Sequence, residues 1–303
     1  WIYVAVGDYG FIKATGADGR EVQMKGGGIA RVRPDGSELE LVSRGQRNIY
    51  DVAISPLMDL FTRDNTNDGG GWNVRLSYVP HGAQMGYPSL FLNFPDEIVQ
   101  PLADYGGGSP CGSLFVDEPT LPGDLGHMLY TCDWGRSVIY RPRLTANGAG
   151  FTAEQESFIE LPRPTDMEID ASGNMYITSW KDGGFNFSNP NVGYLVKVKP
   201  PRTSQAPQRP TSAADDSQLL KQIGSASHTL RLDAQRQILR RGDRPEIATG
   251  LQQLAASSAS LPVRVAAIFT LKQLQGEKSH AGLLALTKDP AVREHVLRAV
   301  ADR

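Results

Sequence analysis

The feature that most constrains the fold is an apolar strand that recurs along the chain and ends at an aspartate. It occurs as IYVAVGD at 2–8, LMDLFTRD at 57–64, MLYTCD at 128–133 and MYITSWKD at 175–182. The aspartates lie 56, 69 and 49 residues apart. Short strands that repeat at intervals near 50 residues indicate a repeat architecture, in which each unit of sheet buries its apolar faces against its neighbours.

Two further patterns accompany these strands. Apolar and cationic residues alternate in GIARVRP (28–34), SVIYRP (137–142) and YLVKVKP (194–200), as they do in half-exposed strands. IYDVAI (49–54) and PTDMEIDASGN (164–174) precede two of the aspartate strands. Such units are typical of the blades of a β-propeller. Because the chain starts inside a strand, we expect about four of six blades here and the others upstream of Trp1.

Composition divides the chain into two parts. Residues 1–200 hold 27 of the 32 glycines and 23 of the 24 aromatic residues, with 16 Lys+Arg against 24 Asp+Glu. Residues 201–303 carry 15 Lys+Arg against 9 Asp+Glu. We therefore predict a mainly β part at 1–200, a Pro/Ser-rich linker at 201–214 and an α-helical part at 215–303.

The helical part shows a second repeat. Comparable helices are expected at 231–242, 263–274 and 292–300, with shorter ones at 248–254 and 281–286 between them. Pro262 and Pro290 stand near two helix starts, where proline is favoured. The spacing predicts HEAT-like repeats, which expose a long face. This array would act either as a spacer or as the docking site of a redox partner protein.

Several function classes are disfavoured. No apolar run approaches the ~18 residues of a membrane span. The basic excess of the second part is spread over separate helices, which argues against nucleic-acid binding. No nucleotide-binding, α/β-hydrolase or CxxCH haem motif occurs. The two cysteines, Cys111 and Cys132, fit either a disulfide of an exported protein or two buried thiols, and we favour the disulfide.

Residues 1–200 resemble a known family. The segments IYVAVGDYG, GGGIARVRPDGS, RNIYDVAISP, MGYP, SPCGSLFV, SVIYRPRL and LPRPTDMEIDASGNMYI stand in the order found in soluble glucose and sorbosone dehydrogenases that depend on pyrroloquinoline quinone (PQQ). These proteins are six-bladed propellers. The resemblance implies oxidation of a sugar or polyol, with PQQ on the propeller axis and Ca²⁺ against the quinone oxygens.

The resemblance also implies roles for single residues. Asp8 matches the aspartate that orients the catalytic histidine, a base expected upstream of Trp1. Arg47 and Asn48 match an Arg-Asn pair at the quinone. A histidine held by a carboxylate removes the hydroxyl proton as hydride leaves, and an arginine stabilises the charge that develops on the quinone.

Other positions depart from the family. An Arg-x-Arg pair that grips the cofactor carboxylates is reduced to Arg163, with Thr165 at the second position. Gly135 replaces a lysine, although Trp134 and Arg136 flank it. We take Arg163, Arg136 and Trp134 as the remaining candidate cofactor contacts. His81 lies in a loop that borders the substrate mouth in the family and is a candidate substrate contact.

The predicted calcium loop contains Asp64, Asn65, Thr66 and Asp68. In the family, most of the ligands of the metal are backbone carbonyls of this loop. Asp64, Thr66 and Asp68 stand at alternate positions, as at the start of an EF-hand loop, but Arg75 stands where the twelfth-position acid is required. An Asx-rich turn between strands explains the segment equally well.

A propeller followed by HEAT-like repeats resembles bacterial proteins called membrane-bound dehydrogenases, which often end in a c-type cytochrome domain. The resemblance implies an exported protein, periplasmic or on the cell surface, that passes electrons to such a cytochrome. The alternative is a non-catalytic propeller and repeat scaffold that has lost the cofactor and binds glycans or proteins.

Overall fold

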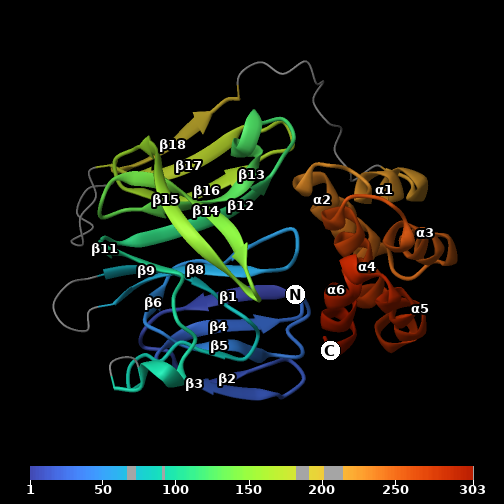
Figure 1. The fold of residues 1–303 in the computed structure, drawn as a ribbon, viewed down its shortest axis with the longest axis horizontal. Coiled ribbons are helices and arrows are strands. Elements are labelled where there is room, and N and C mark those ends of the chain that lie inside the picture. The colour runs from blue at the N-terminus through green and yellow to red at the C-terminus, as the bar shows by residue number, and fades with distance from the viewer. Residues whose placement is uncertain (67–72, 91–92, 182–190, 201–213, 303) are drawn as a thin grey trace.

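The computed structural model describes residues 1–66, 73–90, 93–181, 191–200 and 214–302, and Figure 1 shows its course. Among the described residues, strands run as far as Val198 and α-helices begin at Asp216, so the chain is mainly β and then α, as predicted. Residues 201–213, most of the predicted linker, lie outside the described residues. The domain boundaries at 200 and 214 therefore stay predictions.

The described strands form four sheets in chain order and a hairpin. The first sheet has the order β1 (Ile2–Val6), β4 (Gly27–Val32), β5 (Glu40–Gln46) and β10 (Ala83–Gln84). The second has the order β11 (Ala103–Gly107), β9 (Asn73–Tyr78), β8 (Leu60–Thr66) and β6 (Asn48–Ile49), with β7 (Ala53–Ile54) also on β8.

The third sheet has the order β12 (Pro110–Asp117), β13 (His127–Asp133), β14 (Val138–Asn147) and β15 (Gly150–Glu160). The fourth has the order β16 (Pro164–Ile169), β17 (Met175–Trp180) and β18 (Gly193–Val198). The hairpin joins β2 (Phe11–Thr15) and β3 (Glu21–Met24) beside the first sheet (Figure 1). Apart from β10, which returns to the first sheet after β9, each sheet uses neighbouring stretches of chain, which gives a propeller-like arrangement.

Successive sheets pack face to face through separate apolar clusters. One joins Ile29 and Val42 of the first sheet to Leu60 of the second. Another joins Phe61 of the second sheet to Leu129 of the third. Neighbouring residues of a strand point to opposite faces, so β8 contacts the first sheet through Leu60 and the third through Phe61. This is why every residue of β8 is buried.

The described α-helices after the first confirm the predicted helical segments, whereas the first, at 216–223, was not expected from the sequence. The helices are α1 (Asp216–Ile223), α2 (His228–Arg241), α3 (Pro245–Ala256), α4 (Leu261–Gln275), α5 (His280–Ala285) and α6 (Pro290–Ala301). Asp289 caps α6 by accepting the N–H of Ala291, and Pro290 occupies the first turn. α4 packs against both α3 and α6, and these helices share one apolar core that includes Leu251, Ile268 and Val296.

The helical part packs against one end of the stacked sheets, and the N-terminus lies beside α6 (Figure 1). Arg231 of α2 pairs with Asp117, at the end of β12. Arg298 of α6 lies 3.3 Å from Asp59, the residue before β8. Asp302 lies 2.5 Å from Arg31 of β4. The helices thus contact the third, second and first sheets at the same end.

The expected disulfide is wrong, because Cys111 and Cys132 are free thiols. Cys132 is fully buried among Met128, Tyr130 and Ile139. Burial raises the pKa of Cys111 to about 11 and raises that of Cys132 as well. Both groups are therefore protonated near neutral pH and are poor nucleophiles. In the part of the chain that the structure describes, no helix is long and apolar enough to cross a membrane.

Candidate functional site

The strands have two distinct ends. β1, β8 and β13 begin at the end that contacts the helices, where Asp302, Arg298 and Arg231 reach the strands. They finish at the opposite end, where the recurring aspartates Asp8, Asp64 and Asp133 stand. We call this second end, carrying those aspartates and the loops beside them, the candidate face.

Arg47 is held at the candidate face by two partners. It follows β5, and its Nη2 lies 3.4 Å from Oδ2 of Asp8. Its Nη1 donates to Oδ1 of Asn65 over 3.1 Å. The Arg47 side chain is only 12% exposed, so the guanidinium is fixed by these contacts in a largely buried position. Asp8 therefore orients an arginine of the predicted site.

Asn48 lies next to this pair on β6, opposite Asn65 of β8. It is exposed, and its Oδ1 approaches Gly7 so closely that a Cβ atom there would lie 2.9 Å away. Glycine at position 7 is what permits this approach. The structure thus brings Asp8 together with Arg47 and Asn48, which follow it by about 40 residues in the sequence.

The side chains of the predicted calcium loop are engaged elsewhere. Oδ2 of Asp64 accepts the N–H of Arg47 over 3.1 Å, and Oδ1 lies 3.8 Å from Nε of Arg75. The hydroxyl of Thr66 donates to the carbonyl of Asn73 over 3.4 Å. Burial raises the pKa of Asp64, although the two arginines lower it. Asp68 lies outside the described residues.

The side chains of Asp64, Asn65 and Thr66 form a poor donor set for Ca²⁺. Ca²⁺ requires six to eight oxygens and favours ionised carboxylates. Asp64 instead contacts the guanidinium of Arg75 and the backbone N–H of Arg47, and Asn65 accepts from the Arg47 side chain. Among the residues that the structure describes, no group of three or more Asp, Glu, His or Cys side chains is arranged to hold a metal. The side chains of Asp64, Asn65 and Thr66 are therefore committed to other contacts, and the predicted binding of Ca²⁺ by backbone carbonyls of this loop stays a prediction.

Arg163 and Trp134 form a second part of the candidate face. The Arg163 guanidinium carbon lies 4.5 Å from the centre of the Trp134 ring. Trp180, at the end of β17, lies 6.0 Å from Trp134. The backbone of Arg163 has φ of 44°, which is rare for a residue with a side chain. Bonds of its N–H to Ser137 (3.2 Å) and of its carbonyl to Trp180 (3.0 Å) hold that conformation.

Arg136 is directed toward its own sheet neighbours. Its Nε donates to the carbonyl of Gly107, and its Nη2 lies 3.4 Å from the carbonyl of Tyr105. These contacts fasten the loop between β13 and β14 to β11. The structure gives Arg136 a role in holding this loop, next to Trp134.

A buried pair that the sequence analysis did not single out lies beneath this loop. Arg63 of β8 and Asp133 of β13 have side chains that are each 1% exposed, with Nη2 and Oδ2 3.6 Å apart. Arg63 also donates to the hydroxyl of Thr131 over 2.7 Å. Two charged residues inside otherwise apolar strands were the available signal, since such residues are rarely buried without a partner.

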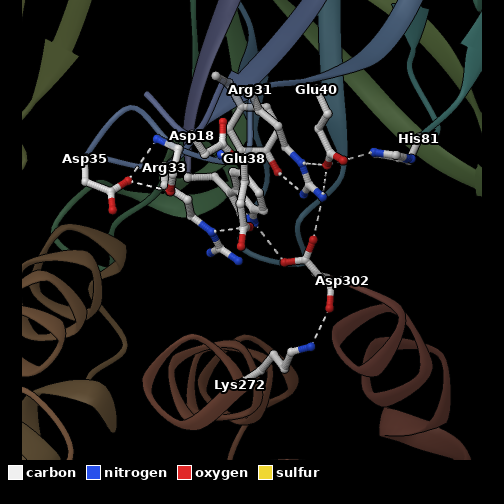
Figure 2. Close-up of polar contacts among 12 residues, drawn as sticks. Asp18, Arg31, Arg33, Asp35, Glu38, Glu40, His81, Lys272 and Asp302 are labelled. Carbon is white, nitrogen blue, oxygen red and sulfur yellow. Dashed lines mark hydrogen bonds and ion pairs between the residues drawn. The ribbon is translucent and has the colours of Figure 1, made fainter. Parts of the chain in front are cut away.

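His81 lies at the other end of the first sheet. Its Nε2 is 3.7 Å from Oε1 of Glu40, which also contacts Arg31, and Figure 2 shows this group beside Asp302. Glu40 begins β5 and Arg47 follows its end, so they lie roughly 20 Å apart at about 3.3 Å per residue. The structure therefore does not bring the predicted substrate residue His81 to Asp8 and Arg47.

The candidate face fits a planar anion better than a metal ion. PQQ is flat and carries three carboxylates, so it requires cations and an aromatic surface. Arg47 and Arg163 supply guanidinium groups, and Trp134 supplies an indole that already stacks with a planar cation. The residues present therefore fit such a ligand, although the family's second arginine and lysine are absent.

The chain matches no protein-family model and no curated protein. Among solved structures it is similar to an oxidoreductase of Thermus thermophilus, provisionally described as a glucose dehydrogenase (19% identity, TM-score 0.47, covering 61% of this chain and 63% of that one). It is also similar to the PQQ-bound aldose sugar dehydrogenase of Streptomyces coelicolor (18% identity, TM-score 0.47, covering 64% and 57%).

The chain thus spans about 60% of the length of these two proteins. Both alignments have identities below 20% and TM-scores below 0.5. Likeness at this level does not transfer an activity or a ligand to this chain.

Proposed function

We propose that the strand-rich part takes part in the quinone-dependent oxidation of a sugar or polyol, with PQQ as the quinone. In this proposal the four sheets are blades of a six-bladed propeller. The observation that carries it is that two arginines with defined contacts stand at the same end of the sheets, Arg47 between Asp8 and Asn65, and Arg163 over Trp134. These positions match the cofactor-contacting residues that the family resemblance implies.

The proposed roles follow from these contacts. Bound PQQ would supply the two-electron acceptor. Arg47 would stabilise negative charge on the quinone side, because Asp8 and Asn65 fix its guanidinium before any ligand arrives. Arg163 would pair with a carboxylate while Trp134 covers the ring plane. The proton acceptor of the reaction is not assigned to a residue described here.

Equilibrium dialysis of the purified protein against PQQ tests the proposal. We expect saturable binding, and we expect Arg47→Met and Arg163→Met each to weaken it by about 10-fold to 100-fold, because a charged hydrogen bond contributes about 1.5–3 kcal/mol. Arg240→Met, on the exposed side of α2, is the matched control and should bind as the wild type does. Absence of binding by the wild type would refute PQQ as the ligand.

Dye reduction with a panel of sugars and polyols, with and without added PQQ, then tests the reaction. Reduction should require PQQ and fall in the two arginine variants but not in Arg240→Met. Binding without turnover for any substrate would remove the enzymatic part of the proposal.

The remaining parts of the proposal concern the surroundings of the protein. We propose HEAT-like repeats for residues 215–303, an exported bacterial protein and a c-type cytochrome as electron acceptor. Reduction of a purified c-type cytochrome in place of the dye tests the last of these. Failure with cytochrome but success with dye would leave the oxidation proposal and remove that acceptor.

The second candidate is a non-catalytic scaffold that binds glycans or proteins. One observation favours it: the cation Arg136 bonds to the backbone carbonyls of Gly107 and Tyr105, so it secures a loop where a cofactor contact was expected. Binding of glycans on an array by a protein that does not bind PQQ would select this candidate.

A further inference from the structure

Three consecutive residues of β8 connect the two parts of the candidate face. β8 lies between the first and third sheets, and its neighbouring side chains point to opposite faces. Arg63 reaches Asp133 of the third sheet, whereas Asp64 reaches the backbone N–H of Arg47 beside the first. Asn65 then bonds the Arg47 side chain.

Arg63 is held firmly where it lies. Its guanidinium contacts Asp133 and Thr131, and its carbon lies 5.8 Å and 5.4 Å from the ring centres of Tyr105 and Tyr140. A buried cation with this many contacts has one favourable position, because any other would leave a charge in the interior without a partner.

Asp133, which contacts Arg63, also binds the backbone of the loop that follows β13. Its Oδ1 accepts the backbone N–H groups of Ser109 and Arg136, each over 3.0 Å. The N–H of Trp134 donates to the carbonyl of Ser109 over 2.8 Å. Gly108 packs against the same carboxylate, where a Cβ atom would come within 2.4 Å of Oδ2. Asp133 therefore holds the backbone of the loop that carries Trp134, and Arg163 lies over the Trp134 indole.

We propose that Arg63, Asp64 and Asn65 are positioning residues that set the distance between Arg47 and the Trp134–Arg163 stack. One strand fixes both parts, so the two guanidinium groups have a defined separation before a ligand binds. The assignment of the ligand as PQQ rests on the proposed function, but the positioning of Trp134 by Arg63 does not.

The first test needs no ligand. The full chain is labelled with 5-fluorotryptophan, and the ¹⁹F signal of Trp134 is identified by its loss in Trp134→Phe. We expect Arg63→Met to move the Trp134 signal and to leave that of Trp1 in place, because Trp1 lies at the helix-contacting end. Asn65→Ala, which acts on the Arg47 part, is the matched control and should leave the Trp134 signal unchanged.

Thr131→Val provides a second, milder variant, since it removes only the hydroxyl that Arg63 contacts. It should move the Trp134 signal in the same direction by a smaller amount, and Arg63→Lys should restore part of the wild-type position. Equal movement of the Trp1 and Trp134 signals, or no movement of the Trp134 signal, would overturn the inference.

The second test uses PQQ as the probe. Arg63→Met and Asn65→Ala should each weaken PQQ binding by about tenfold. Arg63→Met should cause no further loss in a protein that already carries Arg163→Met, but its effect should add to that of Arg47→Met. Additive losses in both pairs would overturn the inference. If the wild type does not bind PQQ, the proposed function fails, and the ¹⁹F experiment alone decides the positioning role.

Discussion

The two ends of the stacked sheets use the same chemistry for different purposes. At the helix-contacting end, Arg231 and Arg298 come from helices and pair with Asp117 and Asp59 of the strand part. At the candidate face, Arg47 and Arg63 belong to the strand part itself and join one sheet to the next. Arginine–aspartate pairs therefore attach the helical part at one end and hold a group of cations in place at the other.

At the helix-contacting end, Asp302 has a partner for both carboxylate oxygens and for its carbonyl. Its Oδ1 lies 2.5 Å from Arg31, its Oδ2 accepts the indole N–H of Trp1 over 2.9 Å, and its carbonyl accepts from Lys272 (Figure 2). Figure 2 shows these contacts crossing from the helices to the first sheet. The helices thus act as a brace across three sheets, a role beyond the spacer or docking array that the sequence suggested.

The largest loss of stability is expected when Arg231, which joins α2 to the third sheet, is replaced. Its side chain is 2% exposed and bonds to Asp117 and to the carbonyls of Ser225 and Ala226. Arg231→Met should lower the free energy of unfolding by about 3–5 kcal/mol, because Oδ2 of Asp117 and the carbonyls of Ser225 and Ala226 all lose this donor, while only His127, among the described residues, still contacts the Asp117 carboxylate. Urea denaturation measures this, with Arg240→Met as the control. A loss below about 1 kcal/mol would mean that this end is not a brace.

The second largest effect is a loss of stability in acid, which arises at the same helix-contacting end. Burial, together with the nearby Arg231, lowers the pKa of His228 to about 4 from its usual value of 6.5. The folded protein therefore binds this proton less readily than the unfolded chain, and the resulting stability is present above pH 6.5 and lost progressively as the pH falls toward 4.

The expected loss between pH 7 and pH 4 is about 2–3 kcal/mol from this residue. Urea denaturation at several pH values gives the slope, and His228→Gln should reduce it by that amount. An unchanged slope in the variant would show that His228 is not held neutral at this end.

A smaller effect is expected at Arg298. Its guanidinium donates to the carbonyls of Leu57 and Met58 and pairs with Asp59, but its side chain is 33% exposed. Solvent screens this pair, so Arg298→Ala should lower the free energy of unfolding by about 1–2 kcal/mol. A loss as large as that of Arg231→Met would remove the distinction between buried and exposed contacts of the brace.

The smallest effect concerns metal at the candidate face. Because Asp64 and Asn65 contact arginines, millimolar Ca²⁺ or EDTA should change the midpoint of thermal unfolding by less than about 1 °C. Thermal scans followed by circular dichroism measure this. A midpoint that rises with Ca²⁺ concentration would show a metal site. The candidate face would then differ from the helix-contacting end in binding a metal ion.

Part of the candidate site could be predicted and part could not. The structure places Asp8 against Arg47 and beside Asn48, whereas the family resemblance implied that Asp8 orients a histidine, so the roles of these residues stay predictions. Arg75 was noted as a misfit in a metal loop, yet its pairing with Asp64 follows only from the register of β8 and β9. His81 was misplaced because a loop position does not reveal which end of a sheet the loop joins.

The order of strands before helices, the aspartates at strand ends and the starts of α4 and α6 all follow from the amino-acid pattern. These properties depend on the periodicity of side chains and on local backbone preferences, which act over a few residues. In contrast, the pairing of Arg63 with Asp133, the free thiols of Cys111 and Cys132 and the contact of Arg231 with Asp117 emerge only in the folded chain. Partners separated by many residues meet only when whole sheets and helices pack, and packing depends on the combined shape and burial of all the elements.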